Sequence, residues 1–164
     1  MPRHGSADAH PPPDVARRKS RGRRKRAPAA AAEPTRQTRS AAWRPSVLVA
    51  DDNIDARAIY GMYLRAMGCR VYTAADGAIA IERALARLPD VIVLDLEMPQ
   101  VDGWAAAQQL KCFRPTRHIP IVALTAVPGA RDSARRCGCD AFLAKPCLPE
   151  LLWCEIRLML DIPT

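Results

Sequence analysis

The chain has 164 residues, of which 49% are hydrophobic and 5% aromatic, a composition typical of a globular protein with one ordinary domain. Its formal net charge of +8 is concentrated in the first 46 residues, which hold 12 Lys and Arg but only 3 Asp and Glu. The sequence has no apolar stretch of about 18 residues, as a transmembrane helix requires, and no apolar run of about 7–15 residues follows the N-terminal charges, as a signal peptide requires.

Residues 1–45 are predicted to form a disordered basic tail rich in Pro, Ala and Arg. Seven of the 15 prolines lie in this part, and eight of the ten residues from Arg17 to Arg26 are Lys or Arg. Like-charge repulsion and missing apolar periodicity disfavour a packed structure. The run at 17–26 suits nucleic acid or an anionic membrane through Coulomb attraction and counterion release, although no aromatic residue interrupts it for base stacking. A solvated extension without a partner is the simpler interpretation, and these alternatives stay open.

The pattern changes at Ser46, where alternating strands and helices begin. The apolar run 47–50 predicts a first strand, and apolar residues at helical spacing from Ala56 to Met67 predict a helix that Gly68 terminates. A second strand is expected at 70–74, followed by a helix with Asp76 as its N-cap. The third strand, 91–94, is a continuous β-branched run of the kind found in strands buried on both faces.

The second half of the domain repeats the same alternation. We expect a helix from about 104 to 113, a strand at 119–124, a short helix at about 129–137, a strand at 141–144 and a helix at about 149–160. Strict alternation with short connections predicts a parallel sheet covered on both faces. Right-handed crossovers and five strands favour an α/β, flavodoxin-like doubly wound domain over residues 46–162, with strand order 2-1-3-4-5.

Polar residues follow four of the five predicted strands. Asp51 and Asp52 follow the first, and the others are Asp95, Thr125 and Lys145. Each has an ordinary explanation when taken alone, such as a helix cap at Asp52 or a solvated charge at Lys145. Because the carboxyl ends of parallel strands meet at one edge, where ligands bind in open α/β sheets, their joint placement predicts a site.

The residue types at this edge indicate phosphoryl chemistry. Carboxylates about 4 Å apart repel by about 4 kcal/mol at an effective dielectric of 20, and a hard cation with oxygen ligands, Mg²⁺ above all, relieves that cost. A cation, an ammonium and a hydroxyl around a carboxylate can stabilise a phosphoryl group, and the carboxylate can be its acceptor. The sequence has no GxGxxG, P-loop or GxSxG motif, and two of its three histidines lie in the tail.

Six cysteines occur, none with the Cys-x2-Cys spacing of a zinc site. We interpret them as reduced thiols that act as small, mostly buried apolar residues.

At residues 46–162 the chain resembles the receiver domain of bacterial two-component response regulators, in particular single-domain, chemotaxis-regulator-like receivers. The resemblance rests on Val-Leu-Val-Ala-Asp51-Asp52-Asn53, Val-Leu-Asp95-Leu-Glu-Met-Pro99-Gln-Val-Asp102-Gly103, Leu124-Thr125-Ala126 and Lys145-Pro146, in this order. It implies that Asp95 accepts a phosphoryl group from a sensor histidine kinase or a phosphotransfer protein.

The resemblance also implies the roles of the surrounding residues. Asp51, Asp52, Asp95 and the backbone carbonyl of Glu97 would hold Mg²⁺, and Lys145 would pair with the phosphoryl oxygens before a cis bond to Pro146. Thr125 and Phe142 would form the switch that reports phosphorylation, although Phe142 lacks the hydroxyl of a tyrosine. No output domain is recognisable, so we expect a cytoplasmic, non-enzymatic phosphoacceptor that acts on an unknown downstream protein.

An Asp-nucleophile phosphohydrolase is the alternative, because such enzymes use a similar set of Asp, Thr, Lys and Mg²⁺. Those enzymes place an Asp-x-Asp loop after their first strand, whereas Asp95-Leu96-Glu97 follows the third strand here. The sequence therefore favours the receiver, with tail-mediated nucleic-acid binding as a further alternative for its output.

Overall fold

The computed structural model describes residues 43–99 and 101–163. The predictions for the basic run 17–26, and for the rest of the tail up to residue 42, lie outside the described residues. The described part alternates strands and helices: β1 (Ser46–Ala50), α1 (Ile54–Ala66), β2 (Arg70–Ala74), α2 (Gly77–Arg87), β3 (Val91–Asp95), α3 (Gly103–Cys112), β4 (Ile121–Thr125), α4 (Arg131–Arg136), β5 (Ala141–Ala144) and α5 (Pro149–Met159).

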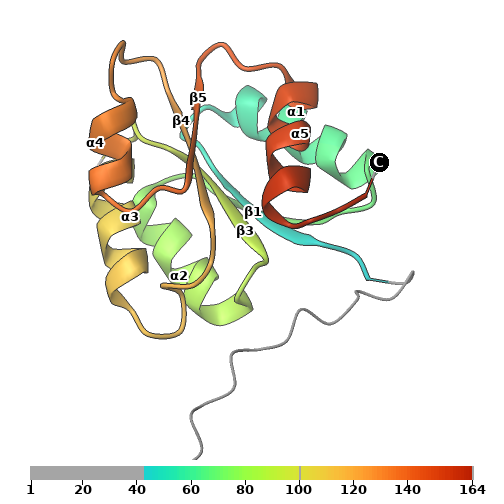
Figure 1. The fold of residues 1–164 in the computed structure, drawn as a ribbon, viewed down its shortest axis with the longest axis horizontal. Helices are drawn as coiled ribbons and strands as arrows, with labels where there is room; N and C mark the ends of the chain where they lie inside the picture. Colours follow the sequence, from blue (N-terminus) through green and yellow to red (C-terminus); the bar gives the residue numbers. More distant parts are fainter. Residues whose placement is uncertain (1–42, 100, 164) are drawn as a thin grey trace, which may run out of the picture. The chain divides into compact units, whose positions relative to one another are not determined.

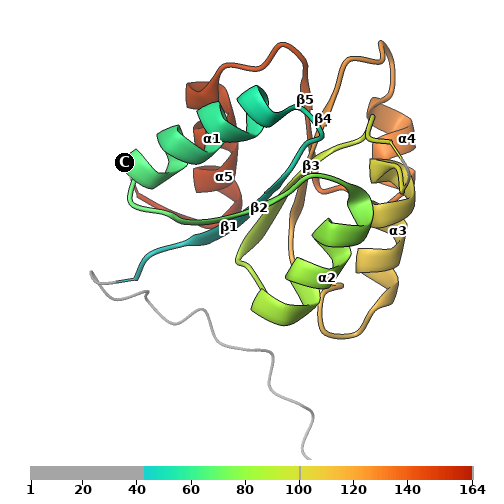
Figure 2. The ribbon, with the colours of Figure 1, turned by 180° about the vertical axis from the view of Figure 1, so that it is seen from behind.

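The five strands form one parallel sheet in the order β2-β1-β3-β4-β5, which confirms the predicted flavodoxin-like topology. Helices α1 and α5 cover one face of the sheet, and α2, α3 and α4 cover the other (Figures 1 and 2). Strands β3 and β4 are buried along their whole length, as their continuous apolar sequences require.

Side-chain caps start three of the helices. The Asn53 side chain accepts from the backbone N–H groups of Asp55 and Ala56, so Asn53 is the N-cap of α1. Asp76 caps α2 as predicted, and Asp102 caps α3 by accepting from Ala105 N–H at 2.7 Å. These caps satisfy N–H groups that have no partner inside the helix, and so they set where each helix begins.

Two element boundaries differ from the sequence predictions for local reasons. Strand β4 begins at Ile121 rather than at 119, because Ile119 N–H bonds to the Thr116 carbonyl in a turn and Pro120 has no N–H to donate. Helix α4 begins at Arg131 rather than at 129, because Gly129 has a φ of 74°, outside the helical region.

The sheet separates two apolar cores. One contains Leu94, Ile121 and side chains of α2, α3 and α4, and the other contains Val93, Leu124 and side chains of α1 and α5. The six cysteines are free, as predicted, but the expectation that most are buried is wrong. Only Cys69 and Cys139 are buried, whereas Cys112 and Cys154 lie exposed on the outer surfaces of their helices.

None of the helices in the described ranges is long and apolar enough to span a membrane.

Candidate functional site

The polar residues at the strand ends gather at the carboxyl edge of the sheet. Asp51 follows β1 directly, Asp95 and Thr125 are the last residues of β3 and β4, and Lys145 follows β5. Because β1, β3, β4 and β5 are neighbours in the sheet, their ends lie side by side at this edge. The tertiary structure therefore brings together residues that are up to 94 positions apart in the sequence.

Lys145 connects two buried carboxylates. Its Nζ donates to Asp51 Oδ2 at 2.8 Å and to Asp95 Oδ2 at 2.6 Å. The Asp51 side chain is 0% exposed and that of Asp95 is 2% exposed, while Lys145 keeps 23% exposure. Buried charges are stable only when they are paired and hydrogen-bonded, and the Lys145 ammonium supplies this pairing to both carboxylates.

Backbone donors occupy the other oxygen of each buried carboxylate. Asn53 N–H donates to Asp51 Oδ1 at 2.9 Å, and Glu97 N–H donates to Asp95 Oδ1 at 3.0 Å. Arg57 of α1 stabilises the loop between β1 and α1 by donating to the backbone carbonyls of Asp51 and Asp52. These hydrogen bonds hold both carboxylates in defined orientations, and the neutral backbone donors do not neutralise the negative charge of either one.

The environment changes the pKa of two of these groups. Burial raises the pKa of Asp95, and the bonds from Lys145 and the Glu97 N–H offset only part of that rise. Burial by itself lowers the pKa of Lys145, but the hydrogen bonds and charges of Asp51 and Asp95 outweigh it and raise that pKa above its usual value. The ammonium is therefore charged at neutral pH.

A third carboxylate completes an acidic cluster. Oxygens of Asp51, Asp52 and Asp95 lie within 4.8 Å of one another, and Asp52 is the exposed member. Three carboxylates against one ammonium leave two uncompensated negative charges. Two ligands on opposite sides of a Mg²⁺ ion are about 4.2 Å apart, so the all-oxygen donor set and its spacing fit this ion after small side-chain shifts.

Thr125 and Glu97 form a second set of contacts beside the acidic cluster. The buried Thr125 hydroxyl donates to Glu97 Oε1 at 3.0 Å, and the Ala126 N–H donates to Glu97 Oε2 at 2.8 Å. Val127 N–H in turn donates to Thr125 Oγ1 at 3.0 Å. The Glu97 carboxylate thus binds two donors at the end of β4, while its backbone N–H binds Asp95.

Phe142, the other predicted switch residue, lies on β5. Its ring is half-buried and packs against the apolar core on the side of α2, α3 and α4. Phe142 lies opposite Ala123 in the register of β4 and β5. Ala123 comes two residues before Thr125 on β4. The structure therefore places Phe142 on β5, beside the strand that carries Thr125, and against the apolar core rather than in the acidic cluster.

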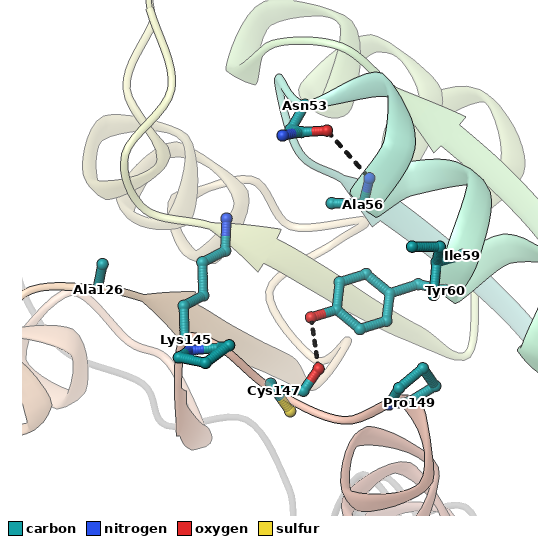
Figure 3. A pocket seen from close by; sticks show the side chains of 9 residues that line it. Asn53, Ala56, Ile59, Tyr60, Ala126, Lys145, Cys147 and Pro149 are labelled. Atoms are coloured by element: carbon teal, nitrogen blue, oxygen red, sulfur yellow. Dashed lines mark hydrogen bonds between the residues drawn. The ribbon is translucent and has the colours of Figure 1, made fainter.

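A cavity of about 530 Å³ adjoins the site on the side of α1 (Figure 3). It is lined by Lys145 and by mostly apolar residues of α1, of the loop after β5 and of the start of α5, including Ile59, Tyr60 and Pro149. The Tyr60 ring extends from α1 toward this loop, where its hydroxyl donates to the Cys147 carbonyl at 3.0 Å. This opening gives a partner molecule a route to Lys145 from the surface.

The structure brings together five of the residues that the sequence predicted for the site, Asp51, Asp52, Asp95, Thr125 and Lys145, and it shows the cis bond between Lys145 and Pro146. From the sequence alone, Glu97 is expected to contribute only its backbone carbonyl, and Arg57 is expected to have no role. A Glu two residues after a strand-end Asp carries no signal of its own, because its target, Thr125, is 28 positions away.

Comparisons with known proteins agree with this geometry. The family described as the response regulator receiver domain matches residues 47–157. The chain is 36% identical over 119 residues to the probable transcriptional regulator ycf27 of Cyanophora paradoxa, covering 71% of this chain and 48% of that relative. It is 31% identical over 103 residues to the polar-differentiation response regulator DivK of Brucella ovis, covering 62% of this chain and 84% of DivK.

The chain thus spans about half the length of ycf27 but most of the length of DivK. Among solved structures, it is similar to the receiver domain of the sensor histidine kinase PA1611 from Pseudomonas aeruginosa, with a TM-score of 0.67 and 29% identity. That match covers 73% of this chain and 99% of the PA1611 domain, which has a magnesium ion coordinated in its active site cleft.

Proposed function

Because this chain belongs to the response regulator receiver domain family, we propose that Asp95 is the residue on which it accepts a phosphoryl group. Receiver domains act in two-component phosphorelay signalling, and this chain is one of them. The observation that supports Asp95 is its position: a buried carboxylate at the end of the central strand β3, bonded to Lys145 and within 4.8 Å of two further carboxylates.

In the proposed reaction, an oxygen of Asp95 attacks the phosphorus of a phosphohistidine on a sensor kinase or phosphotransfer protein. The bond between phosphorus and the histidine nitrogen breaks, the imidazole keeps the electron pair, and an acyl phosphate forms on Asp95. The chain itself then carries the product, so its own activity is limited to self-phosphorylation and autodephosphorylation.

Lys145 is placed to stabilise the charge that develops on the phosphoryl group. Its ammonium already lies 2.6 Å from Asp95 Oδ2, so it needs little movement to bind an oxygen of a group attached there. Asp51, Asp52, Asp95 and the Glu97 backbone carbonyl would hold Mg²⁺, as the magnesium in the PA1611 receiver suggests. A bound Mg²⁺ would add positive charge next to the phosphoryl oxygens.

Thr125 and Phe142 are the proposed reporters of phosphorylation. The Thr125 hydroxyl ends β4 next to the acidic cluster, and Phe142 lies on the neighbouring strand. A hydroxyl that moves toward a phosphoryl group leaves space behind it, and the half-buried ring of Phe142 can then pack farther inward. The surface of α4, β5 and α5 would carry this change to a downstream protein.

We place the approach of the phosphodonor at the cavity beside α1, because this cavity reaches Lys145, which is bonded to Asp95. Ile59, which is 55% exposed, lines this cavity, and Ile54 and Met62 of the same helix are each 69% exposed, so α1 offers apolar side chains to a partner. Such a surface suits a helix of the kinase or phosphotransfer protein. Six free cysteines fit the reducing cytoplasm, where we place this exchange.

Binding of nucleic acid or an anionic membrane by the basic run 17–26 stays a prediction. Comparison of the full chain with a variant lacking residues 1–40 tests it, and salt-sensitive binding is expected for the full chain alone.

Incubation with acetyl phosphate and Mg²⁺, followed by mass spectrometry of the intact protein, tests the phosphoacceptor. The wild type should gain the mass of one phosphoryl group, and Asp95→Asn should gain none. Asp102→Asn is the matched control, because asparagine also caps helices and α3 should stay intact. Labelling of the Asp95→Asn protein, or no labelling of the wild type, would overturn the proposal.

A further inference from the structure

The Glu97 carboxylate occupies the Thr125 hydroxyl, which the proposed function assigns to the phosphoryl group, together with the neighbouring Ala126 N–H. Its Oε1 accepts from the Thr125 hydroxyl at 3.0 Å and its Oε2 accepts from the Ala126 N–H at 2.8 Å. Both donors lie at the end of β4, the strand next to β3. A carboxylate with two bound oxygens imitates two oxygens of a phosphoryl group in charge and in the donors that it requires.

The Thr125 hydroxyl cannot serve two anions at once. It has one proton to donate, and in this structure that proton goes to Glu97. Its oxygen is also engaged, because Val127 N–H donates to it at 3.0 Å, which restricts the directions in which the proton can point. Binding of Thr125 to a phosphoryl group therefore requires that the bond to Glu97 breaks.

The same residue also contacts the phosphoacceptor. Glu97 N–H donates to Asp95 Oδ1 at 3.0 Å, so the backbone of Glu97 is tied to Asp95 while its side chain is tied to Thr125 and Ala126. The side chain is exposed, which leaves it free to swing into solvent when another anion takes its place. Glu97 thus links the residue that is modified to the residue that responds.

We propose that Glu97 is an internal competitor of the phosphoryl group, a latch that holds Thr125 and Ala126 in the unphosphorylated arrangement. This inference rests on the proposed role of Asp95. Phosphorylation replaces one set of hydrogen bonds with another, and the energy needed to release Glu97 reduces the affinity of the site for phosphoryl-like anions. One charge-assisted hydrogen bond at an exposed site corresponds to a reduction of about tenfold.

Two variants separate the latch from a simple effect of charge. Glu97→Ala removes the carboxylate, whereas Glu97→Asp keeps the negative charge but is one methylene too short to reach both Thr125 and Ala126. Beryllium fluoride with Mg²⁺ serves as the probe, because it adds to a carboxylate as a phosphoryl-like group. Its affinity is measured by titration, and hydrogen exchange at the Ala126 amide is measured by NMR without the probe.

A latch predicts that the Ala126 amide exchanges about fivefold faster or more in both variants, and that both bind the probe about tenfold more tightly than the wild type. Unchanged exchange in Glu97→Ala, or tighter binding in Glu97→Ala with wild-type binding in Glu97→Asp, would overturn it. Failure of the Asp95 proposal looks different, because the wild type would then form no adduct and accept no phosphoryl group from acetyl phosphate.

Discussion

Gly103 is the first residue of α3 and lies against the end of β3. Gly103→Ala therefore tests whether α3 must pack directly on the backbone of Asp95. A Cβ atom on Gly103 would lie 2.0 Å from the Asp95 carbonyl oxygen and 2.5 Å from Leu96 Cα. Ordinary van der Waals contact begins at 3.4 Å, so α3 and the end of β3 would have to separate by more than 1 Å. Both neighbours are backbone atoms, which cannot rotate away as a side chain can.

We expect Gly103→Ala to lower the free energy of unfolding by about 3 kcal/mol, at the upper end of overpacking effects. At about 4 °C per kcal/mol for a domain of this size, Tm falls by roughly 12 °C. Urea unfolding followed by circular dichroism measures the first quantity and a thermal scan the second. Labelling by acetyl phosphate should fall as well, because the displaced segment carries Asp95.

Gly61→Ala is the matched control within α1. A Cβ there meets only the Arg65 guanidinium, at 3.1 Å, the far end of a flexible side chain. Alanine is favoured over glycine inside a helix, so we expect a gain of about 0.5–1 kcal/mol. A Gly103→Ala protein within 1 kcal/mol of the wild type, or an equal loss in Gly61→Ala, would refute the reasoning.

Three further predictions concern the charges of the site and the buried thiols. Lys145→Met leaves Asp51 and Asp95 buried without their cation, and we expect urea unfolding in EDTA near neutral pH to show a loss of about 3 kcal/mol. Mg²⁺ should raise the Tm of the wild type in proportion to the logarithm of its concentration, and Asp52→Asn should need about tenfold more Mg²⁺ for the same rise. Burial raises the pKa of Cys139 to about 12, so the folded thiol stays protonated while the unfolded thiol ionises above pH 9. The stability that this thiol contributes is therefore complete below pH 9 and is lost as pH rises toward 12. Between pH 8 and 11, the free energy of unfolding of the wild type should fall by about 2 kcal/mol more than that of Cys139→Ala.

Each of these predictions has an outcome that contradicts it. A Lys145→Met protein as stable as the wild type in EDTA would mean that the two carboxylates do not depend on the ammonium. Potassium chloride at matched ionic strength controls for screening, and an equal Tm rise with that salt would remove the case for a specific Mg²⁺ site. Equal alkaline losses in wild type and Cys139→Ala would show that Cys139 ionises equally in both states.

Much of the fold was predictable because its determinants are local. The apolar run at β3, the helical spacing in α1 and the cap at Asp76 each lie within one element, and the observed elements follow them closely. The boundaries of β4 and α4 were predicted less well. The Ile119 N–H bonds to the Thr116 carbonyl in a turn, and Gly129 has a positive φ. An apolar pattern in the sequence reveals neither the turn nor the positive φ.

The sequence by itself determined which residue types stand at the strand ends, and alternation of strands and helices then implied that Asp51, Asp95, Thr125 and Lys145 share one edge. Only the tertiary structure decided how they pair. Lys145 bonds to Asp51 and Asp95. The exposed Glu97 side chain accepts hydrogen bonds from Thr125 and Ala126. The physical reason is that short apolar patterns along the chain specify where each strand ends. Hydrogen bonds between loops instead depend on distances of a few ångströms, and packing of the whole domain sets these distances.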